Sequence, residues 1–405
     1  MTGLTRRNSR KASVAPPVAA GDSEADKLRQ KIQNNWYLPV EELDEDEIRI
    51  SFMGTNYAGR PGQSMSSVFI ETGNGDSFVF DCGCGVISRY TAMGVPSSRM
   101  TKVFLTHLHG DHTSDLVTLY CFGPAHDRKT PLHVYGPSGP ILDKIEYTDQ
   151  GTKAFCESLY RMCAWHRESM SFLKTGLTDG RDGYQLVPHE LGYREVGTAY
   201  DAGDVTITHF PAAHDRDGSI SYKLEYHGMK VVFSGDTKPT RWMLQQGKGA
   251  DVLIHEMALS VETWVNHMAG LYDGDVGYRE AYKEMQEVQD NSHTPEEQLG
   301  KILASCKPKL AVITHCHFNQ DTFIEGVSGV RKYYRGPLAW ATDLVVLNVK
   351  PGGDIKQRMA VVPDYSWDIT GKSYPPRELA DSKYHGPYAQ FSDFTMRHIL
   401  PGSKP

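Results

Sequence analysis

The sequence predicts an α/β fold in which several strands end at one shared site. Two observations carry this prediction. From residue 48 onward, short apolar strands alternate with glycine-containing turns and helical stretches. Several of these strands also end on a histidine or a carboxylate, and converging strand ends are how α/β and sandwich folds build a site. The 405 residues suffice for one large domain with extensions or for two average domains.

The bulk composition narrows the class of protein. A formal net charge of −7 argues against a protein that holds nucleic acid mainly by phosphate neutralisation, which needs a basic face. No apolar run approaches the roughly 18 residues of a membrane span, so we expect no membrane partner. The 7 cysteines match no disulfide framework, and no apolar signal region follows Arg6-Arg7. We therefore expect a cytoplasmic protein.

Three segments are expected along the chain. Residues 1–45 combine a basic patch, a Pro/Ala stretch and an acidic run without a core signature, which predicts an N-terminal arm. Its apolar anchor at 36–39 can dock on the body or on a neighbouring subunit, while 1–20 is equally compatible with a disordered leader. The main domain then spans 46–350. The aromatic and proline-rich residues 351–405 bury their rings only against another surface, so we expect homo- or hetero-oligomer contacts through the terminal extensions.

The first strands of the main domain lead to an acidic residue. Apolar strands are predicted over 48–54, 67–71 and 77–81. The Gly-Asn-Gly-Asp sequence between the last two is a strong hairpin signal. Asp81 ends the third strand, where its carboxylate can fix the backbone of the following histidine loop through hydrogen bonds.

A histidine-rich stretch follows the next strand, at 102–105. His107 and His109 are alternate residues of an extended segment and therefore point the same way. A glycine turn after them lets Asp111 and His112 face a second metal close to the first. The alternative is a surface loop that happens to be rich in histidine. It is disfavoured because four of the six residues from His107 to His112 carry ligand side chains. This stretch predicts a metal cradle.

Residues 140–195 are predicted to be an insertion of helices rich in aromatic residues. Two roles remain open for this insertion. It can form a lid or wall at a substrate site, or it can provide a packing or oligomer surface.

Four strands in the second half repeat the pattern of polar strand ends. The residues that follow or close these strands are His214, Asp236, the pair His255-Glu256, and His315. His214 has the right setting for a third ligand to the first metal, and the carboxylate of Asp236 can reach two cations and bridge them. One such histidine alone is best explained as a hydrogen-bonded core residue. Its repetition at several strand ends reverses that preference.

With these residues the chain resembles the metallo-β-lactamase-fold hydrolases, in the ribonuclease Z-like and arylsulfatase-like branch. The matching motifs are Asp81 after a strand, Thr-His-Leu-His-Gly-Asp-His at 106–112, His214, Ser-Gly-Asp-Thr at 234–237, Leu-Ile-His-Glu at 253–256 and Ile-Thr-His at 313–315. The resemblance implies a four-layer αβ/βα sandwich and two metals bridged by Asp236. It assigns the first metal to His107, His109 and His214, and the second to Asp111, His112 and His315. His317 lies near the last ligand position, but His315 directly follows the strand.

The resemblance also implies the chemistry. Two divalent cations lower the pKa of a bridging water toward neutrality and give a hydroxide nucleophile, which Asp111 and Asp236 orient. His255 donates a proton to the leaving group or stabilises its charge, with Glu256 setting its tautomer. The alternative for His255 is a structural role. Zinc suits the imidazole-rich sites, and manganese or iron are tolerated by the carboxylates.

We expect a metal-dependent hydrolase with a small-molecule ester-type substrate. Its candidates are an aryl sulfate, a phosphodiester, a lactone and an activated nitroaryl ether such as an aryl methyl ether. The link from Tyr226 to Lys230 is too short for the tRNA-gripping arm of many ribonuclease Z enzymes, and the chain is acidic, so nucleic acid is not the expected partner. Three alternatives remain: a diiron oxidase of the same fold, a tRNA 3′-end endonuclease, and a non-catalytic scaffold subunit.

Overall fold

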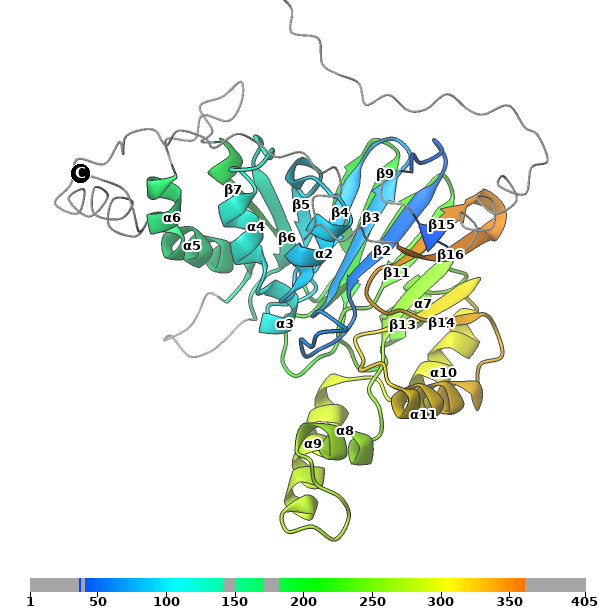
Figure 1. Ribbon diagram of the computed structural model, residues 1–405. Coiled ribbons are helices and arrows are strands. Elements are labelled where there is room, and N and C mark those ends of the chain that lie inside the picture. The colour runs from blue at the N-terminus through cyan, green and yellow to red at the C-terminus, as the bar shows by residue number, and fades with distance from the viewer. Residues whose placement is uncertain (1–35, 38–40, 141–149, 171–181, 361–405) are drawn as a thin grey trace, which may run out of the picture. The chain divides into compact units, whose positions relative to one another are not determined.

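Two mixed β-sheets pack face to face and carry helices on their outer sides (Figure 1). The computed structural model describes residues 36–37, 41–140, 150–170 and 182–360. In this part of the chain the layers run helix, sheet, sheet, helix. The predicted four-layer α/β sandwich is confirmed.

The first sheet has nine strands in the order β1-β16-β15-β2-β3-β4-β5-β6-β7. Its strands are β1 (Trp36–Tyr37), β2 (Ile48–Gly54), β3 (Ser67–Thr72), β4 (Ser77–Phe80), β5 (Lys102–Phe104), β6 (Leu132–Pro137), β7 (Leu186–Leu191), β15 (Val345–Lys350) and β16 (Asp354–Ala360). β2, β3 and β4 pair antiparallel, and β4 to β7 pair parallel. The predicted hairpin at 73–76 joins β3 to β4, with Gly75 at a φ of 92°.

The second sheet has seven strands in the order β14-β13-β12-β11-β10-β9-β8. Its strands are β8 (Gly197–Ala202), β9 (Val205–Pro211), β10 (Ile220–Tyr226), β11 (Met229–Phe233), β12 (Val252–Glu256), β13 (Leu310–Thr314) and β14 (Leu338–Trp340). Tyr226 pairs with Met229, so the β10–β11 turn contains only His227 and Gly228. Strands β11 to β14 pair parallel, which places their carboxyl ends at one edge of the sheet.

Helices cover the outer face of each sheet. Those against the first sheet are α2 (Val86–Ala92), α4 (Leu116–Phe122) and α5 (Thr152–Met162), followed by α6 (Ala164–Ser169). Those against the second are α7 (Arg241–Gln246), α10 (Glu296–Cys306) and α11 (Gln320–Arg331). The short α3 (Gly110–Thr113) follows β5, whereas α8 (Val261–Met268) and α9 (Tyr278–Ser292) form a projection from the body (Figure 1). Single 3-10 turns are η1 (Ser97–Arg99), η3 (Asp182–Tyr184) and η4 (Pro351–Gly353). No helix among the described residues is long and apolar enough to cross a membrane.

The strands of the first sheet alternate their side chains between two cores. Ile50 and Phe52 of β2 pack in the core between the sheets, whereas Met53 joins the core beneath the helices. Phe104 and Val103 of β5 divide in the same way. This alternation is the period of two that a strand buried on both faces requires.

Phe104 should contribute strongly to stability because it links the two sheets. Its ring is fully buried, 4.4 Å from the ring centroid of Tyr135 and 5.6 Å from that of Tyr222 in the second sheet. We expect Phe104→Ala to lower the free energy of unfolding by about 3–5 kcal/mol. Phe122→Ala, at a side chain 48% exposed, should lower it by less than about 1 kcal/mol. Urea denaturation of both variants tests this, and equal losses would contradict the position given to Phe104.

Three expected boundaries differ from the structure. The interval 140–195 is helical only in part, because β7 within it extends the first sheet alongside β6. The sheet also continues past 350, since β16 pairs with β15, and residues 36–37 of the predicted arm pair with β16. A short strand can be held in a sheet by backbone hydrogen bonds alone, without an alternating apolar pattern. Sequence periodicity therefore does not predict it. The predicted oligomer contacts of the tail fall on 361–405, outside the described residues.

Candidate metal centre

Strands from both sheets deliver their polar ends to one place. The residues brought together there are His107, His109, Asp111 and His112 after β5, His214 after β9, Asp236 after β11 and His315 after β13. These are the same seven residues that the sequence singles out as metal ligands. They fall into two groups that share one carboxylate.

The first group consists of three imidazoles. Nε2 of His214 lies 3.2 Å from Nδ1 of His109. The ring of His107 lies 4.6 Å from that of His109 and 4.8 Å from that of His214, measured between centroids. The donor atoms of all three are within 4.8 Å of one another. His107 and His214 are buried and His109 is exposed, so the group is open on one side.

The second group combines two carboxylates with two imidazoles. Oδ2 of Asp111 lies 3.2 Å from Nε2 of His112 and 3.1 Å from Nε2 of His315. Asp236 closes the group, with Oδ2 3.4 Å from Nε2 of His112 and Oδ1 3.4 Å from Nε2 of His315. His317 takes no part, because its Nδ1 lies 3.4 Å from the Tyr57 hydroxyl instead.

Asp236 lies between the two groups. Its Oδ2 is 3.9 Å from Nε2 of His107 and 3.9 Å from Nε2 of His214, in addition to its contacts with the second group. The carboxylate follows β11 and the left-handed Gly235, whose φ is 57°. A Cβ at Gly235 would lie 2.6 Å from Thr106, so only glycine lets β11 pass this closely beside the histidine loop. One carboxylate thus reaches both groups.

The donor atoms fit divalent cations. Metal–ligand bonds of about 2.0–2.1 Å at tetrahedral angles place neighbouring donors roughly 3.3 Å apart, close to the separations found here. Three atoms of the candidate ligands are buried and lack a hydrogen-bond partner among the described residues: Nε2 of His107, Nε2 of His112 and Oδ1 of Asp236. A buried polar atom without a partner costs about 1–3 kcal/mol. Coordination of a cation by each of these atoms would remove that cost.

Burial and neighbouring charges set the protonation of the ligands. Burial lowers the pKa of His107 well below its usual range and also lowers that of His214, so both imidazoles are neutral, the form that binds metal. Although burial opposes the change, His112 holds the pKa of Asp111 below its ordinary value. Burial likewise opposes the change at Asp236, yet the facing histidines hold its pKa well below the ordinary value. Both carboxylates are therefore ionised and available to a cation.

Asp81 positions the second group without belonging to it. Its buried carboxylate lies 2.7 Å from Nδ1 of His112 and accepts a hydrogen bond of 2.8 Å from the backbone N–H of Thr106. The predicted tie between Asp81 and the histidine loop is therefore present. Holding the proton at Nδ1 leaves Nε2 of His112 free for a metal, and carboxylates of this kind orient metal-binding histidines.

We expect Asp81→Asn to weaken the second metal selectively. The amide offers a neutral oxygen or an N–H to His112 in place of a carboxylate, so the orientation and basicity of the imidazole both suffer. Partners of this type are worth about 10–100-fold in metal affinity. Competition with a chromophoric chelator measures it, with Asp76→Asn, at a partly buried ion pair with Lys102, as the matched control. Unchanged affinity in Asp81→Asn would show that Asp81 does not orient His112.

His255 and Glu256 occupy different places. Nδ1 of His255 lies 2.7 Å from the backbone oxygen of Glu256, its ring is 1% exposed, and it lines neither of the two cavities described below. This position does not favour the expected role of His255 as proton donor. The side chain of Glu256 points to a different histidine, His293, whose Nδ1 lies 3.0 Å from Oε2.

His293 is the site residue that sequence reasoning missed. It follows helix α9 rather than a strand, so a search for polar strand ends passes over it. Its ring lies 5.0 Å from that of His214 and 5.9 Å from that of His315. Burial opposes protonation, but Glu256 raises the pKa of His293 to about 9. The available signal was the segment Ser292-His293-Thr294, a polar interruption between two helical stretches.

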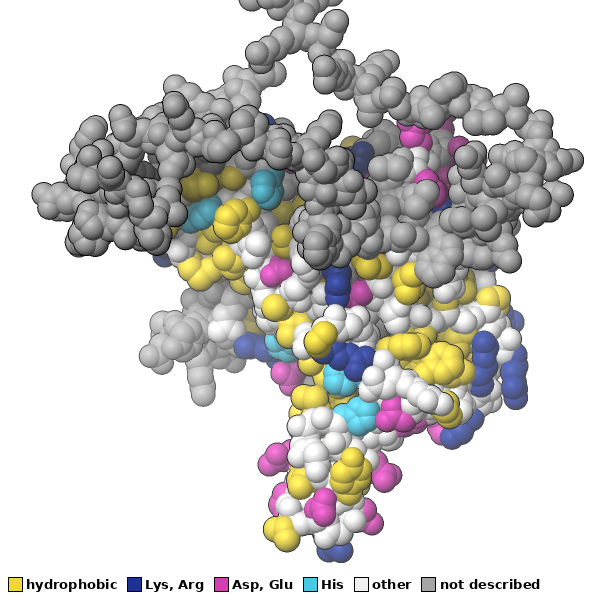
Figure 2. Space-filling model, viewed as in Figure 1, with side chains coloured by type: hydrophobic (Ala, Val, Ile, Leu, Met, Phe, Trp, Pro, Cys, Tyr) yellow, Lys and Arg dark blue, Asp and Glu magenta, His cyan; other side chains and the backbone are white. Residues whose placement is uncertain are grey.

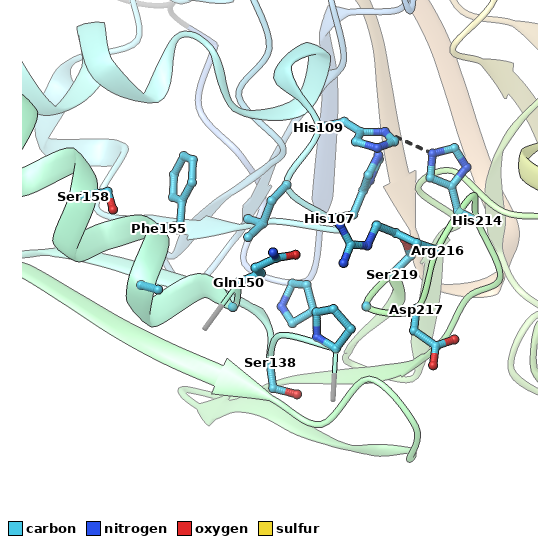
Figure 3. A pocket seen from close by; sticks show the side chains of 16 residues that line it. His107, His109, Ser138, Gln150, Phe155, Ser158, His214, Arg216, Asp217 and Ser219 are labelled. Carbon is cyan, nitrogen blue, oxygen red and sulfur yellow. Dashed lines mark hydrogen bonds between the residues drawn. The ribbon is translucent and has the colours of Figure 1, made fainter. Parts of the chain in front are cut away.

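Two cavities flank the candidate metal centre. The first, of about 410 Å³, extends from His107, His109 and His214 toward α5 and contains Phe155 and Arg216 (Figure 3). The second, of about 330 Å³, is lined by Asp111, Asp236 and His315 of the second ligand group, by His293, and by apolar side chains of the α8–α9 projection. His109 and His214 line both. The centre therefore faces two spaces of different chemistry.

Comparisons with known proteins agree with this geometry. A family profile described as beta-lactamase superfamily domain matches residues 76–316. Ribonuclease Z of Mycobacterium bovis (strain BCG / Pasteur 1173P2) is 31% identical over 218 residues, covering 51% of this chain and 69% of that protein. Ribonuclease BN of Proteus mirabilis (strain HI4320) is 28% identical over 239 residues, covering 52% and 76%. The crystal structure of the metallo-beta-lactamase fold protein YhfI from Bacillus subtilis matches with a TM-score of 0.50 at 17% identity, covering 75% of this chain and 100% of that one, which supports the fold alone.

These relatives correct the expectation about the partner. Proteins named ribonuclease Z and ribonuclease BN act on RNA, which contradicts the prediction that the partner is a small molecule and that nucleic acid is not expected, and favours the tRNA endonuclease alternative. Net charge is a poor predictor of the substrate because it describes the whole chain, whereas a substrate responds to the local potential at the site. The tight β10–β11 turn leaves no room for a tRNA-gripping arm at that position, but RNA can be contacted by other parts of the chain.

The family profile spans more than half of the 405 residues, and a relative above 30% identity is covered over 69% of its length. The residues matched by the profile, 76–316, include the histidine loop and His315. The chain belongs to the beta-lactamase superfamily, as a metal-dependent hydrolase of its ribonuclease Z-like branch.

Proposed function

We propose that this chain hydrolyses phosphodiester bonds in RNA with two divalent metal ions. The observation that carries the proposal is the pair of ligand groups joined by Asp236, because a bridged two-metal centre suits displacement at phosphorus. The ribonuclease relatives supply the substrate class. Cleavage at the 3′ end of tRNA, one of the alternatives drawn from the sequence, is the form of this activity we test first.

The proposed ligands hold two ions, one on each side of Asp236. His107, His109 and His214 hold the first, and Asp111, His112 and His315 hold the second. Bound there, the two ions would lower the pKa of a shared water and neutralise charge on the phosphate. The majority of imidazole donors favours zinc, while the two carboxylates also suit manganese or iron.

His293 is the proposed proton donor. Hydrolysis forms a new bond from a water oxygen to phosphorus and breaks the bond to the leaving oxygen, which must then take up a proton. His293 faces the cavity beside the second ligand group, and Glu256 holds its Nδ1 at 3.0 Å. Glu256 is itself fixed by the backbone N–H of Thr237, 2.8 Å from Oε1. The proton at Nε2 of His293 is therefore available to the leaving oxygen.

The surface charges differ between the α8–α9 projection and the region of α10 and α11, and this difference bears on where RNA binds. The α8–α9 projection carries acidic side chains (Figure 2), among them the exposed Glu284, Glu287 and Asp290 of α9. These charges repel phosphates. Lysine and arginine side chains gather instead over the region of α10 and α11, where Lys301 and Arg335 are exposed. We therefore expect RNA phosphates to contact the region of α10 and α11 rather than the projection. Such contacts make the RNA affinity decrease as the salt concentration rises.

Cellular setting and assembly also remain proposals. We retain a cytoplasmic location because all 7 cysteines are unpaired, as suits a reducing compartment, and 6 of them are buried. Oligomer contacts through the terminal extensions are retained on the sequence argument alone.

A direct assay tests the proposed activity. Full-length protein loaded with zinc or manganese is incubated with a hairpin RNA carrying a single-stranded 3′ extension and with an unstructured RNA of equal length. We expect cleavage of the hairpin substrate near the junction, and none by Asp236→Ala. A preparation that holds two ions per chain and leaves both RNAs intact would overturn the proposal.

A further inference from the structure

The two cavities beside the candidate metal centre differ in a way that orients a substrate. His293 and Glu256 operate only on the side of the second cavity, because His293 lines that cavity and not the first. A leaving oxygen that takes its proton from His293 must therefore depart on that side. The part of the substrate that keeps the phosphate then occupies the opposite side.

We infer that the first cavity is a nucleotide subsite for the part of the RNA that retains the phosphate after cleavage, with Phe155 binding its base and Arg216 binding an adjoining phosphate. The inference rests on the proposed RNA hydrolysis and specifies which product the protein holds beside His107, His109 and His214. A cavity of about 410 Å³ is large enough for one nucleotide.

Arg216 is placed to bind an anion. It follows His214 by two residues, and an isolated β-bridge between the two fixes the arginine beside the first ligand group. Figure 3 shows its guanidinium pointing into the cavity, while Asp217 points away. Asp217 pairs with Arg194 at 3.0 Å, and no ion pair of Arg216 occurs among the described residues. A free guanidinium offers the forked donors that phosphate binding uses.

The anion contact cannot come from the adjacent helix start. Helix α5 begins at Thr152 beside the cavity, but the backbone N–H of Lys153 donates to Oε1 of Glu190 at 2.9 Å. A carboxylate therefore already occupies this helix N-terminus. Arg216 is left as the positively charged side chain among the described residues that line the cavity.

Phe155 supplies a flat apolar surface across the cavity. Its ring rises from α5 on the side opposite Arg216 (Figure 3), and it packs partly against the core beneath the helices. This backing keeps the ring in place, while its remaining face is open to the cavity. Stacking of a base on an aromatic ring tolerates any base, which suits a subsite that does not read sequence.

The subsite is tested with esters that differ only in the retained group. Uridine 5′-(p-nitrophenyl phosphate) and uridine 3′-(p-nitrophenyl phosphate) place a nucleoside on the retained side, and methyl p-nitrophenyl phosphate places a methyl group there. We expect kcat/KM of the wild type to favour at least one uridine ester over the methyl ester by ~10-fold or more. Phe155→Ala should remove most of that preference through KM and leave the methyl ester within about twofold. Arg216→Gln should act only on an ester that carries a second phosphate, and we expect it to raise KM for uridine 3′-phosphate 5′-(p-nitrophenyl phosphate) while the methyl ester stays within about twofold.

Matched variants and a binding measurement complete the test. Phe122→Ala and Arg241→Gln remove a phenylalanine and an arginine that line neither cavity, and both should keep the preference for the uridine ester. Calorimetric titration of metal-free protein with a 2′-O-methyl-uridine dinucleotide should show binding that Phe155→Ala and Arg216→Gln weaken ~10-fold.

The outcomes separate the subsite from the proposed function. Equal kcat/KM for the two uridine esters and the methyl ester, together with dinucleotide binding that both variants leave unchanged, would overturn the subsite while RNA hydrolysis stands. Absence of hydrolysis for every ester and RNA, with two ions bound, would overturn the proposed function. In that case the dinucleotide titration still decides the subsite by itself.

Discussion

Replacing Asp236 with alanine is expected to abolish phosphodiester hydrolysis and to reduce the metal content below two ions per chain. The carboxylate touches both ligand groups, at 3.4 Å from His112 and 3.9 Å from His107, so its loss weakens both positions at once. Metal ions contribute several kcal/mol of transition-state stabilisation, which corresponds to a rate loss of about a thousandfold or more. Elemental analysis and initial rates on the hairpin RNA measure the two effects.

The matched control for Asp236→Ala is Asp354→Ala. Asp354 lies exposed at the start of β16 and is not among the candidate ligands, so its removal should leave metal content and rate unchanged. An Asp236→Ala protein that still binds two ions and cleaves at the wild-type rate would remove the basis for a bridged centre.

Replacing His293 with glutamine is expected to slow RNA cleavage by about 10²–10⁴-fold while two metal ions stay bound, because proton donation to the leaving oxygen is lost. A p-nitrophenolate leaving group needs no proton, so hydrolysis of methyl p-nitrophenyl phosphate should fall much less. Rates on the two substrates, together with metal analysis, separate this role from metal binding. Equal losses on both substrates would instead indicate that His293 is a ligand.

The dependence of the cleavage rate on pH gives a second test of the roles of His293 and Glu256. Burial opposes the protonated form of His293, and Glu256 raises its pKa to about 9. A donor with a raised pKa stays protonated to higher pH, so activity should fall on the alkaline side as that proton is lost. Glu256→Gln removes the charge that holds the proton, and we expect its alkaline limb to move to lower pH. An alkaline limb that does not move would contradict the coupling of Glu256 to His293.

Strand-end patterns predicted the positions of the candidate ligands because those residues depend on local chain geometry. A buried strand that ends in a polar residue can be read from the residues next to it, as at His214, Asp236 and His315. Parallel pairing then brings the strand ends to one edge, which the alternation of strands and helices also predicts. The fold class followed from the same pattern.

The features that the sequence did not predict depend on contacts distant along the chain. His293 faces the site because α9 ends beside His214, and no strand signal precedes it. β7 joins the first sheet as an edge strand beside β6, far earlier in the chain, and β1 pairs with β16 from the other end of the described residues. A nucleic-acid substrate, which the ribonuclease relatives favour, was placed second for a different reason, since whole-chain charge was used as a substitute for the charges around one cavity.

Anomalous diffraction at the zinc absorption edge, from crystals of the metal-loaded protein, shows directly whether two ions share Asp236. We predict two peaks about 3.5–4 Å apart, one on each side of Asp236. One peak would lie among His107, His109 and His214, and the other among Asp111, His112 and His315. A single peak, or a peak held by Glu256, His293 and His315, which also lie within ligand distance of one another, would contradict it.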